Sequence, residues 1–131
     1  MTPSKLGALA LVCAAGAGTA AGRPATPDDY ARLARVGDPQ VDPAGQWVAY
    51  TVGVTDVAAD KGVTHIWMTS WDGARTVQLT QRPNESETTP RFSPDGRWLA
   101  FWDQLNHGIA IVSRDGKTRH AFIPDASEPA W

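Results

Sequence analysis

Residues 90–101 read Pro-Arg-Phe-Ser-Pro-Asp-Gly-Arg-Trp-Leu-Ala-Phe, and residues 39–50 read Pro-Gln-Val-Asp-Pro-Ala-Gly-Gln-Trp-Val-Ala-Tyr. The two stretches start 51 residues apart and share two Pro, one Gly, one Trp and one Ala at the same positions. A second matching unit follows each copy, residues 66–75 after the first and residues 109–118 after the second. An internal repeat of this length is typical of proteins that stack copies of one structural unit.

Each copy is predicted to form four short strands joined by tight turns. The pairs Asp95-Gly96 and Asp115-Gly116 indicate hairpin turns, because glycine accepts a positive φ and aspartate bonds the backbone two residues further on. Along residues 98–102, both faces of the predicted strand are apolar. A strand of this kind belongs in a sheet that is covered on both sides.

A four-stranded sheet of about 40 residues, stacked between similar sheets, is a blade of a β-propeller. A two-sheet sandwich is the alternative, but it gives no reason to reuse the same Pro, Gly and Trp positions. The expected fold is therefore all-β, an incomplete propeller over residues 38–131. Its blades are expected at about 39–89 and 90–128, a third begins at 129, and residues 53–64 form a loop insertion. Since closed propellers have at least about four blades, two blades leave both outer faces wet, and the isolated chain is expected to fold poorly or to aggregate.

Residues 23–37 are predicted to be a linker and a short amphipathic helix. Thr26 can accept a hydrogen bond from a free backbone N–H, and Pro27 and the two aspartates after it suit a first helical turn. Tyr30, Leu33 and Ala34 fall on one face at helical spacing, and Gly37 is placed to end a helix of two or three turns.

Residues 1–22 have the composition of a secretory signal peptide. One lysine near the start is followed by the apolar residues 6–12 and then by small residues up to Gly22. The apolar stretch is too short to span a membrane comfortably. The sequence thus predicts an exported protein, periplasmic or secreted, with no membrane span after signal cleavage. A disordered leader and a lipoprotein anchor on Cys13 are the alternatives.

The charge and cysteine content argue against several kinds of partner. The net charge is −2 and no run of Lys or Arg occurs, so the chain lacks the basic patch expected for nucleic acid. A single Cys builds neither a disulfide framework nor a cysteine zinc cluster. His65, His107 and His120 are too dispersed for metal-ligand spacing. We therefore predict no metal and no cofactor. The aspartates at 72, 95, 103 and 115 are interpreted as mostly turn residues, and Asp95 as a surface ion-pair partner of Arg97.

Five tryptophans occupy strand positions within the repeat. They could stack against a sugar or a base, but repeat spacing favours the core between blades. These residues are Trp47, Trp67, Trp71, Trp98 and Trp102.

The repeat now supports a resemblance. Residues 92–101 resemble the repeat of TolB-type propellers, which also occurs in the propeller of prolyl oligopeptidase-family serine peptidases. A short helix that runs directly into residues 36–52, followed by an insertion and then by residues 65–68, is similar to the opening of acylaminoacyl-peptidase and dipeptidyl-peptidase relatives. TolB would have a separate α/β domain before its first blade.

This resemblance implies that the propeller lies over an α/β-hydrolase domain, which carries the catalytic Ser, Asp and His. No catalytic residue is carried over to this chain, because no serine lies in a Gly-x-Ser-x-Gly elbow. The serines concerned are Ser4, Ser70, Ser86, Ser93, Ser113 and Ser127. The chain is expected to be a non-catalytic N-terminal fragment that controls access of peptides to a peptidase domain. The alternative is an exported TolB-like propeller that binds proteins. The sequence leaves the oligomeric state open.

Residues 85–87, Glu-Ser-Glu, are a weak candidate for a substrate clamp. Dipeptidyl peptidases of the family hold the free amino terminus of the substrate with a pair of glutamates from the propeller. The position of residues 85–87 between two repeat copies favours a solvated loop instead.

Overall fold

The computed structural model describes residues 22–126, 129 and 131. The predicted signal peptide therefore lies outside the described residues. One helix and eight strands follow in order: α1 (Pro27–Ala31), β1 (Arg35–Val41), β2 (Trp47–Asp56), β3 (Lys61–Ser70), β4 (Thr76–Gln78), β5 (Glu87–Phe92), β6 (Trp98–Asp103), β7 (Gly108–Ser113) and β8 (Arg119–Pro124).

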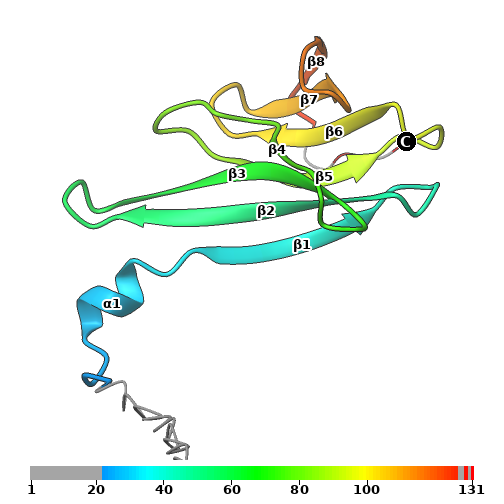
Figure 1. Ribbon diagram of the computed structural model, residues 1–131. Coiled ribbons are helices and arrows are strands. Elements are labelled where there is room, and N and C mark those ends of the chain that lie inside the picture. The colour runs from blue at the N-terminus through cyan, green and yellow to red at the C-terminus, as the bar shows by residue number, and fades with distance from the viewer. Residues whose placement is uncertain (1–21, 127–128, 130) are drawn as a thin grey trace, which may run out of the picture.

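The strands form two four-stranded antiparallel sheets, one for each copy of the repeat. In both sheets the spatial order of the strands is their order in the chain, β1 to β4 in the first and β5 to β8 in the second. Figure 1 shows the sheets stacked, with α1 outside them beyond β1. Strand β5 contacts β1, β2 and β3, so the sheets meet at the first strand of the second one. The all-β prediction is confirmed, and the fold is an incomplete propeller of two blades.

A repeated turn closes three of the hairpins, those between β3 and β4, β5 and β6, and β7 and β8. In the turn of residues 93–96, the Ser93 hydroxyl donates to Asp95 Oδ1 at 2.5 Å, and the same carboxylate oxygen accepts the N–H of Arg97 at 3.0 Å. The N–H of Trp98 then donates to Ser93 Oγ at 3.1 Å, while Gly96 has a φ of 67°. Residues 70–73 and 113–116 form the same turn. Asp95 thus holds the turn by accepting the Ser93 hydroxyl and the backbone N–H of Arg97, and no ion pair with Arg97 is present among the described side chains.

These turns predict a loss of stability in acid. The serine hydroxyl, and after it the backbone N–H, lowers the pKa of Asp72, Asp95 and Asp115 below its ordinary value. A carboxylate with a lowered pKa in the folded chain stabilises it above the unfolded pKa of about 4, and this contribution is lost as the pH falls below that value. At pH 7 we expect a D72N/D95N/D115N variant to have a lower urea midpoint than the parent chain. Measurements at pH 7, 5 and 3 should show that this difference in midpoint becomes smaller in acid. A deficit that is the same at pH 7 and pH 3 would contradict this.

The core lies between the two sheets. Leu99 and Phe101 of β6 are fully buried, as are Ala49 of β2 and Ile66 of β3 opposite them. Leu79, which follows β4, and the half-buried Phe92 complete the cluster. Burial of these apolar side chains on facing sheets is the main force that holds one sheet against the other.

The tryptophan prediction is confirmed for Trp47 and wrong for Trp71. Trp47 alone belongs to the buried core, at 9% exposure, whereas Trp71 is 70% exposed. The other three are half-buried. Trp67 and Trp102 lie on the sides of their sheets that face away from the other sheet. Successive side chains of a strand point to opposite faces, so the neighbours of a core residue point outward.

The predicted loop insertion is also wrong, because it forms part of a long hairpin. Gly53 pairs with Thr64, and the ladder continues to Asp56 opposite Lys61, which leaves a turn of only four residues at 57–60. Valine and threonine dominate both arms of this extension, and β-branched residues favour an extended backbone. Strands β2 and β3 therefore extend beyond the core, and in this extension they are held largely by the hydrogen bonds between them.

The helix begins as predicted but ends early. Thr26 and Asp29 form a capping box, with proline in the first turn, and the side chain of Arg23 pairs with that of Asp29. The helix stops at Ala31, and Tyr30 and Leu33 are 70% and 60% exposed, so no buried face forms. Residues 35–37 instead pair with β2, because strand pairing outweighs a weak local helical preference. The first blade thus starts before the predicted residue 39. No helix in the described part of the chain is long and apolar enough to cross a membrane.

Candidate functional site

The first strands of the two blades carry matching irregularities. Pairing with the neighbouring strand is interrupted between Gly37 and Gln40 in β1 and between Thr88 and Arg91 in β5. Asp38 and Thr89, each directly before a proline, have positive φ values of 45° and 58°. Proline has no N–H to donate to the ladder, and an extra residue at such a break redirects the neighbouring side chains.

These two breaks bring opposite charges together across the blades. Arg91 Nη1 donates to both carboxylate oxygens of Asp38 at 3.1 Å, and Gln40 Nε2 donates to Asp38 Oδ1 at 3.0 Å. The side chains of Arg91 and Asp38 are 31% and 33% exposed, so both groups are open to a molecule in solution. We call Asp38, Gln40 and Arg91 the inner-edge cluster, because it lies where β1 and β5 meet.

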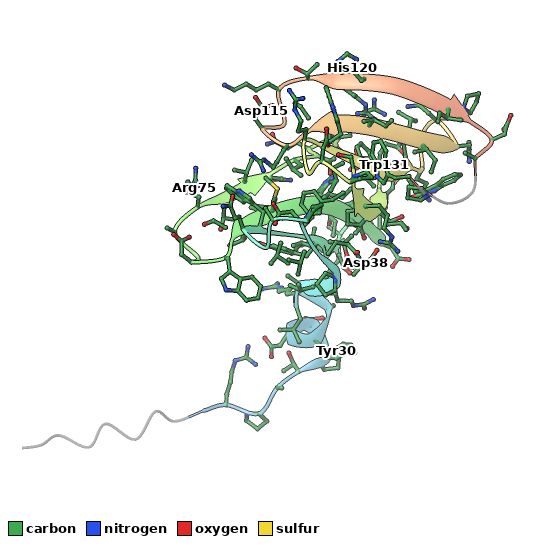
Figure 2. The ribbon with its side chains drawn as sticks, turned by 90° about the vertical axis from the view of Figure 1, so that its right-hand side faces the viewer. Tyr30, Asp38, Arg75, Asp115, His120 and Trp131 are labelled. Atoms are coloured by element: carbon green, nitrogen blue, oxygen red, sulfur yellow. The ribbon has the colours of Figure 1, made fainter. Side chains whose placement is uncertain are left out.

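A shallow groove lies next to the inner-edge cluster. The indole N–H of Trp131 donates to the carbonyl of Arg91 at 3.1 Å. Figure 2 shows Trp131 and Asp38 toward one edge of the molecule and Arg75 toward the other. The groove has a volume of about 280 Å³ and is lined mainly by prolines, aromatic side chains and small polar groups. Among them are Val41, Pro43, Phe92, Pro94, Pro129 and Trp131.

A second cluster of charges surrounds the buried Asp103 at the end of β6. Asp103 is 1% exposed, and its carboxylate accepts hydrogen bonds from Arg82, Arg119 and Asn106. The guanidinium of Arg119 also lies 5.4 Å from the centre of the Phe101 ring. Asp103 does take part in a turn, because it accepts the N–H of Asn106 at 3.3 Å, but its carboxylate in addition joins β6, β8 and the linker that precedes β5.

Glu87 was expected in a solvated loop, and the structure corrects this. It is the first residue of β5 and is fully buried, and its Oε2 is hydrogen-bonded to His65 Nδ1 at 2.9 Å. Its other oxygen, Oε1, has no partner among the described side chains. Because its carboxylate has no solvent-exposed surface, Glu87 is not placed to hold the amino terminus of a substrate. The sequence around Glu87 does not indicate that it is buried, because its partner His65 lies 22 residues away in the chain.

His120 and four of the serines make structural contacts, whereas His107 is exposed. His120 packs edge-on against Trp98 with ring centres 4.8 Å apart, and Ser86 Oγ accepts the N–H of Thr64 at 3.1 Å. Ser70, Ser93 and Ser113 donate to the turn aspartates. Within residues 22–126, 129 and 131, no group of three potential metal ligands occurs. Ser4 and Ser127 lie outside the described residues.

Comparison with known proteins gives a peptidase relative. The chain is 37% identical over 112 residues to the uncharacterized peptidase YuxL of Bacillus subtilis (strain 168). The aligned region covers 81% of this chain and 17% of that protein. No family model matches the chain.

Solved structures share the fold. The acylaminoacyl peptidase of Pyrococcus horikoshii superposes with a TM-score of 0.60 at 19% identity, over 75% of this chain and 15% of that one. The AtxE2 isopeptidase superposes with a TM-score of 0.62 at 20% identity, over 80% of this chain and 21% of that one. This chain therefore spans less than a quarter of the length of each of these proteins. The resemblance to peptidases predicted from the repeat is thus confirmed: the chain is similar in sequence to a peptidase and similar in fold to an acylaminoacyl peptidase and an isopeptidase.

Proposed function

We propose that this chain is the N-terminal propeller part of an exported serine peptidase, and that it controls which peptides reach a hydrolase domain elsewhere in the protein. The observation that carries the proposal is the 37% identity to a peptidase along most of the chain. The meeting of β1 and β5 supports a ring whose first strands line the axis. Bond cleavage would use a serine nucleophile and an acyl intermediate in that other domain.

The inner-edge cluster is the group that we expect a peptide to meet. Arg91 and Asp38 are partly exposed and lie on first strands, and neither belongs to the buried core. A peptide can contact one cation and one anion there, and the groove beside them is lined by prolines and aromatic side chains. Such a surface can discriminate between peptides by charge without taking part in bond cleavage.

A labelling experiment on the native protein tests the proposal. An antibody raised against residues 22–126 is used to precipitate the protein from cell envelope and medium after treatment with a fluorophosphonate probe, which reacts with activated serines. We expect a labelled polypeptide longer than 131 residues. Its labelled serine should lie in a Gly-x-Ser-x-Gly elbow, and its amino terminus should start near residue 23. An unlabelled protein built from further blades would instead support a TolB-like binding module, and a cytosolic protein with an intact Met1 would contradict export.

Substitutions in the inner-edge cluster are expected to change peptide preference in opposite directions. Arg91→Gln leaves Asp38 without its cation, so kcat/KM in the full-length enzyme should fall for acidic peptides relative to basic ones. Asp38→Asn leaves Arg91 unpaired and should have the reverse effect. One charge at a distance of several ångströms in water is worth roughly a two- to fivefold change, reduced by salt. Equal effects on both peptide classes would show that the cluster does not select by charge.

A further inference from the structure

The connections between strands divide between two ends of the sheets. The chain enters β1 at one end, and because neighbouring strands alternate in direction, the β2–β3 turn and the linker from β4 to β5 lie at that same end. The β6–β7 turn of the second blade joins them there. Ser86 in the linker accepts the N–H of Thr64 with Oγ and the N–H of Gln104 with its carbonyl, both at 3.1 Å. We call this end the entry end, and Figure 1 shows α1 and the β2–β3 turn on this side.

Exposed apolar side chains are concentrated at the entry end. Val57 in the β2–β3 turn and Leu105 in the β6–β7 turn are 49% and 50% exposed, and Tyr30 and Leu33, ahead of β1, are 70% and 60% exposed. In the connections at the opposite end, Trp71 is the one exposed large hydrophobic side chain among the described residues. The four side chains at the entry end lie in turns and in the segment before β1, and not on the sheet faces against which blades pack. An apolar surface of this kind indicates a contact with another protein surface.

The first blade also extends further than the second blade at the entry end. Thr51 and Thr64 lie on the same side of the first sheet as the core residues Ala49 and Ile66, because side chains two residues apart in a strand share a face. A groove of about 310 Å³ continues along this side of the hairpin. The surface that packs against the second blade therefore continues beyond that blade. Among the residues that line the groove are Gly37, Thr51, Gly53, Thr55, Gly62 and Thr64.

The path of the chain indicates what covers the entry end. The last strand of each blade, β4 or β8, ends there, and the N–H of Asp125 after β8 donates to the carbonyl of His107 in the β6–β7 turn at 3.0 Å. A domain that follows the last blade of such a ring is therefore tethered at the entry end, which raises its local concentration at this surface. The aligned region is 17% of the peptidase relative, which leaves most of that protein for further blades and another domain.

We propose that the β2–β3 hairpin, the β6–β7 turn and the segment before β1 form the docking surface for the hydrolase domain of the same polypeptide. This inference rests on the proposed function, because that domain is the partner. Val57 and Leu105 supply apolar area to the contact, and burial of such area is the main favourable contribution to association. The hydrogen bonds of the hairpin continue into the core of the first blade, so docking holds the propeller in place over the domain that it covers.

Thiol reactivity in the full-length polypeptide tests the contact. Ala58→Cys and Ala74→Cys are a matched pair, because both alanines are exposed and each donates its N–H to the aspartate two residues before it. Ala58 lies at the entry end and Ala74 at the opposite end. We expect maleimide to modify the Ala58→Cys thiol at least about tenfold more slowly, the factor that corresponds to a free energy of local opening of about 1.4 kcal/mol. The two rates, measured by mass spectrometry of the modified peptides, should become equal in urea.

A second substitution and a cross-link identify what protects the thiol. Leu105→Glu in the Ala58→Cys protein should raise the modification rate toward that of Ala74→Cys, because it places a charge in an apolar contact. Ala44→Glu, in an exposed turn at the opposite end, is the control and should leave the rate unchanged. Circular dichroism checks the β-structure, and Leu33→Glu replaces Leu105→Glu if the latter does not fold. A diazirine attached to the Ala58→Cys thiol should cross-link to the domain that contains the fluorophosphonate-labelled serine.

The outcomes separate this contact from the proposed function. Equal rates for the two thiols in a polypeptide with a labelled serine would overturn the contact and leave the proposed function standing. Cross-links found only to propeller blades or to a second copy would also overturn the contact, as would a rate that the glutamate at the entry end does not raise. A polypeptide without an activated serine would overturn the proposed function and this contact together.

Discussion

Replacement of Phe101 by alanine is expected to destabilise the chain more than any other single truncation of the core. Phe101 is fully buried between the two sheets, and the guanidinium of Arg119 lies over its ring. Truncation of a buried Phe to Ala costs about 3–5 kcal/mol, because transfer free energy is lost and a cavity remains. This loss is a large part of the free energy of unfolding of a typical domain, which is about 5–15 kcal/mol. The shift of the urea midpoint, read by circular dichroism, measures the effect.

Two further substitutions separate the cavity from other effects. Phe101→Leu keeps most of the volume and is expected to cost about 1–1.5 kcal/mol. Leu105→Ala removes an apolar side chain that is 50% exposed and should change the midpoint little. Similar losses for Phe101→Ala and Leu105→Ala would mean that the two sheets are not packed as described.

Asp103→Asn is expected to have the next largest effect. The substitution keeps the size of the side chain but removes the charge that Arg82 and Arg119 share. Loss of one partner from a buried ion pair typically costs about 3–5 kcal/mol. Because both arginines are partly exposed, at 33% and 39%, and water can solvate them, we expect a loss near the lower limit, about 3 kcal/mol.

The control and the compensating variant address the origin of this loss. Asp60→Asn makes the same chemical change in an exposed turn with a φ of 49°, which Asn tolerates, and should be nearly neutral. A D103L/R82M/R119M variant removes all three charges and should be more stable than Asp103→Asn, since no charge is left unpaired. If Asp103→Asn is as stable as Asp60→Asn, the cluster does not contribute to the stability of the fold.

Local chemistry made much of the fold predictable. The turn at residues 93–96 closes through bonds within a few residues of each other, so its sequence is sufficient to locate the hairpin. Thr26 caps α1 for the same reason. Repetition of such local signals in the same order then predicted two similar sheets, which the structure confirms.

Predictions that depended on distant partners did less well. Gly53 was expected in a loop, but its ladder partner Thr64 continues the strand, and neither residue alone indicates this. Trp67 and Trp102 have core-like side chains and still lie on outer faces, because burial depends on which sheet covers them. Glu87 resembles a loop residue in the sequence until His65 is brought next to it.

The sequence by itself determined the repeat, the turns and hence the two-bladed all-β fold, because these depend on contacts between residues close in the chain. The tertiary structure alone decided which charges are buried and which are open. Asp103 and Glu87 are buried, whereas Asp38 and Arg91 meet at an accessible edge. The physical reason is that solvation of a side chain is set by the surface packed against it, and that surface comes from residues far away in the sequence.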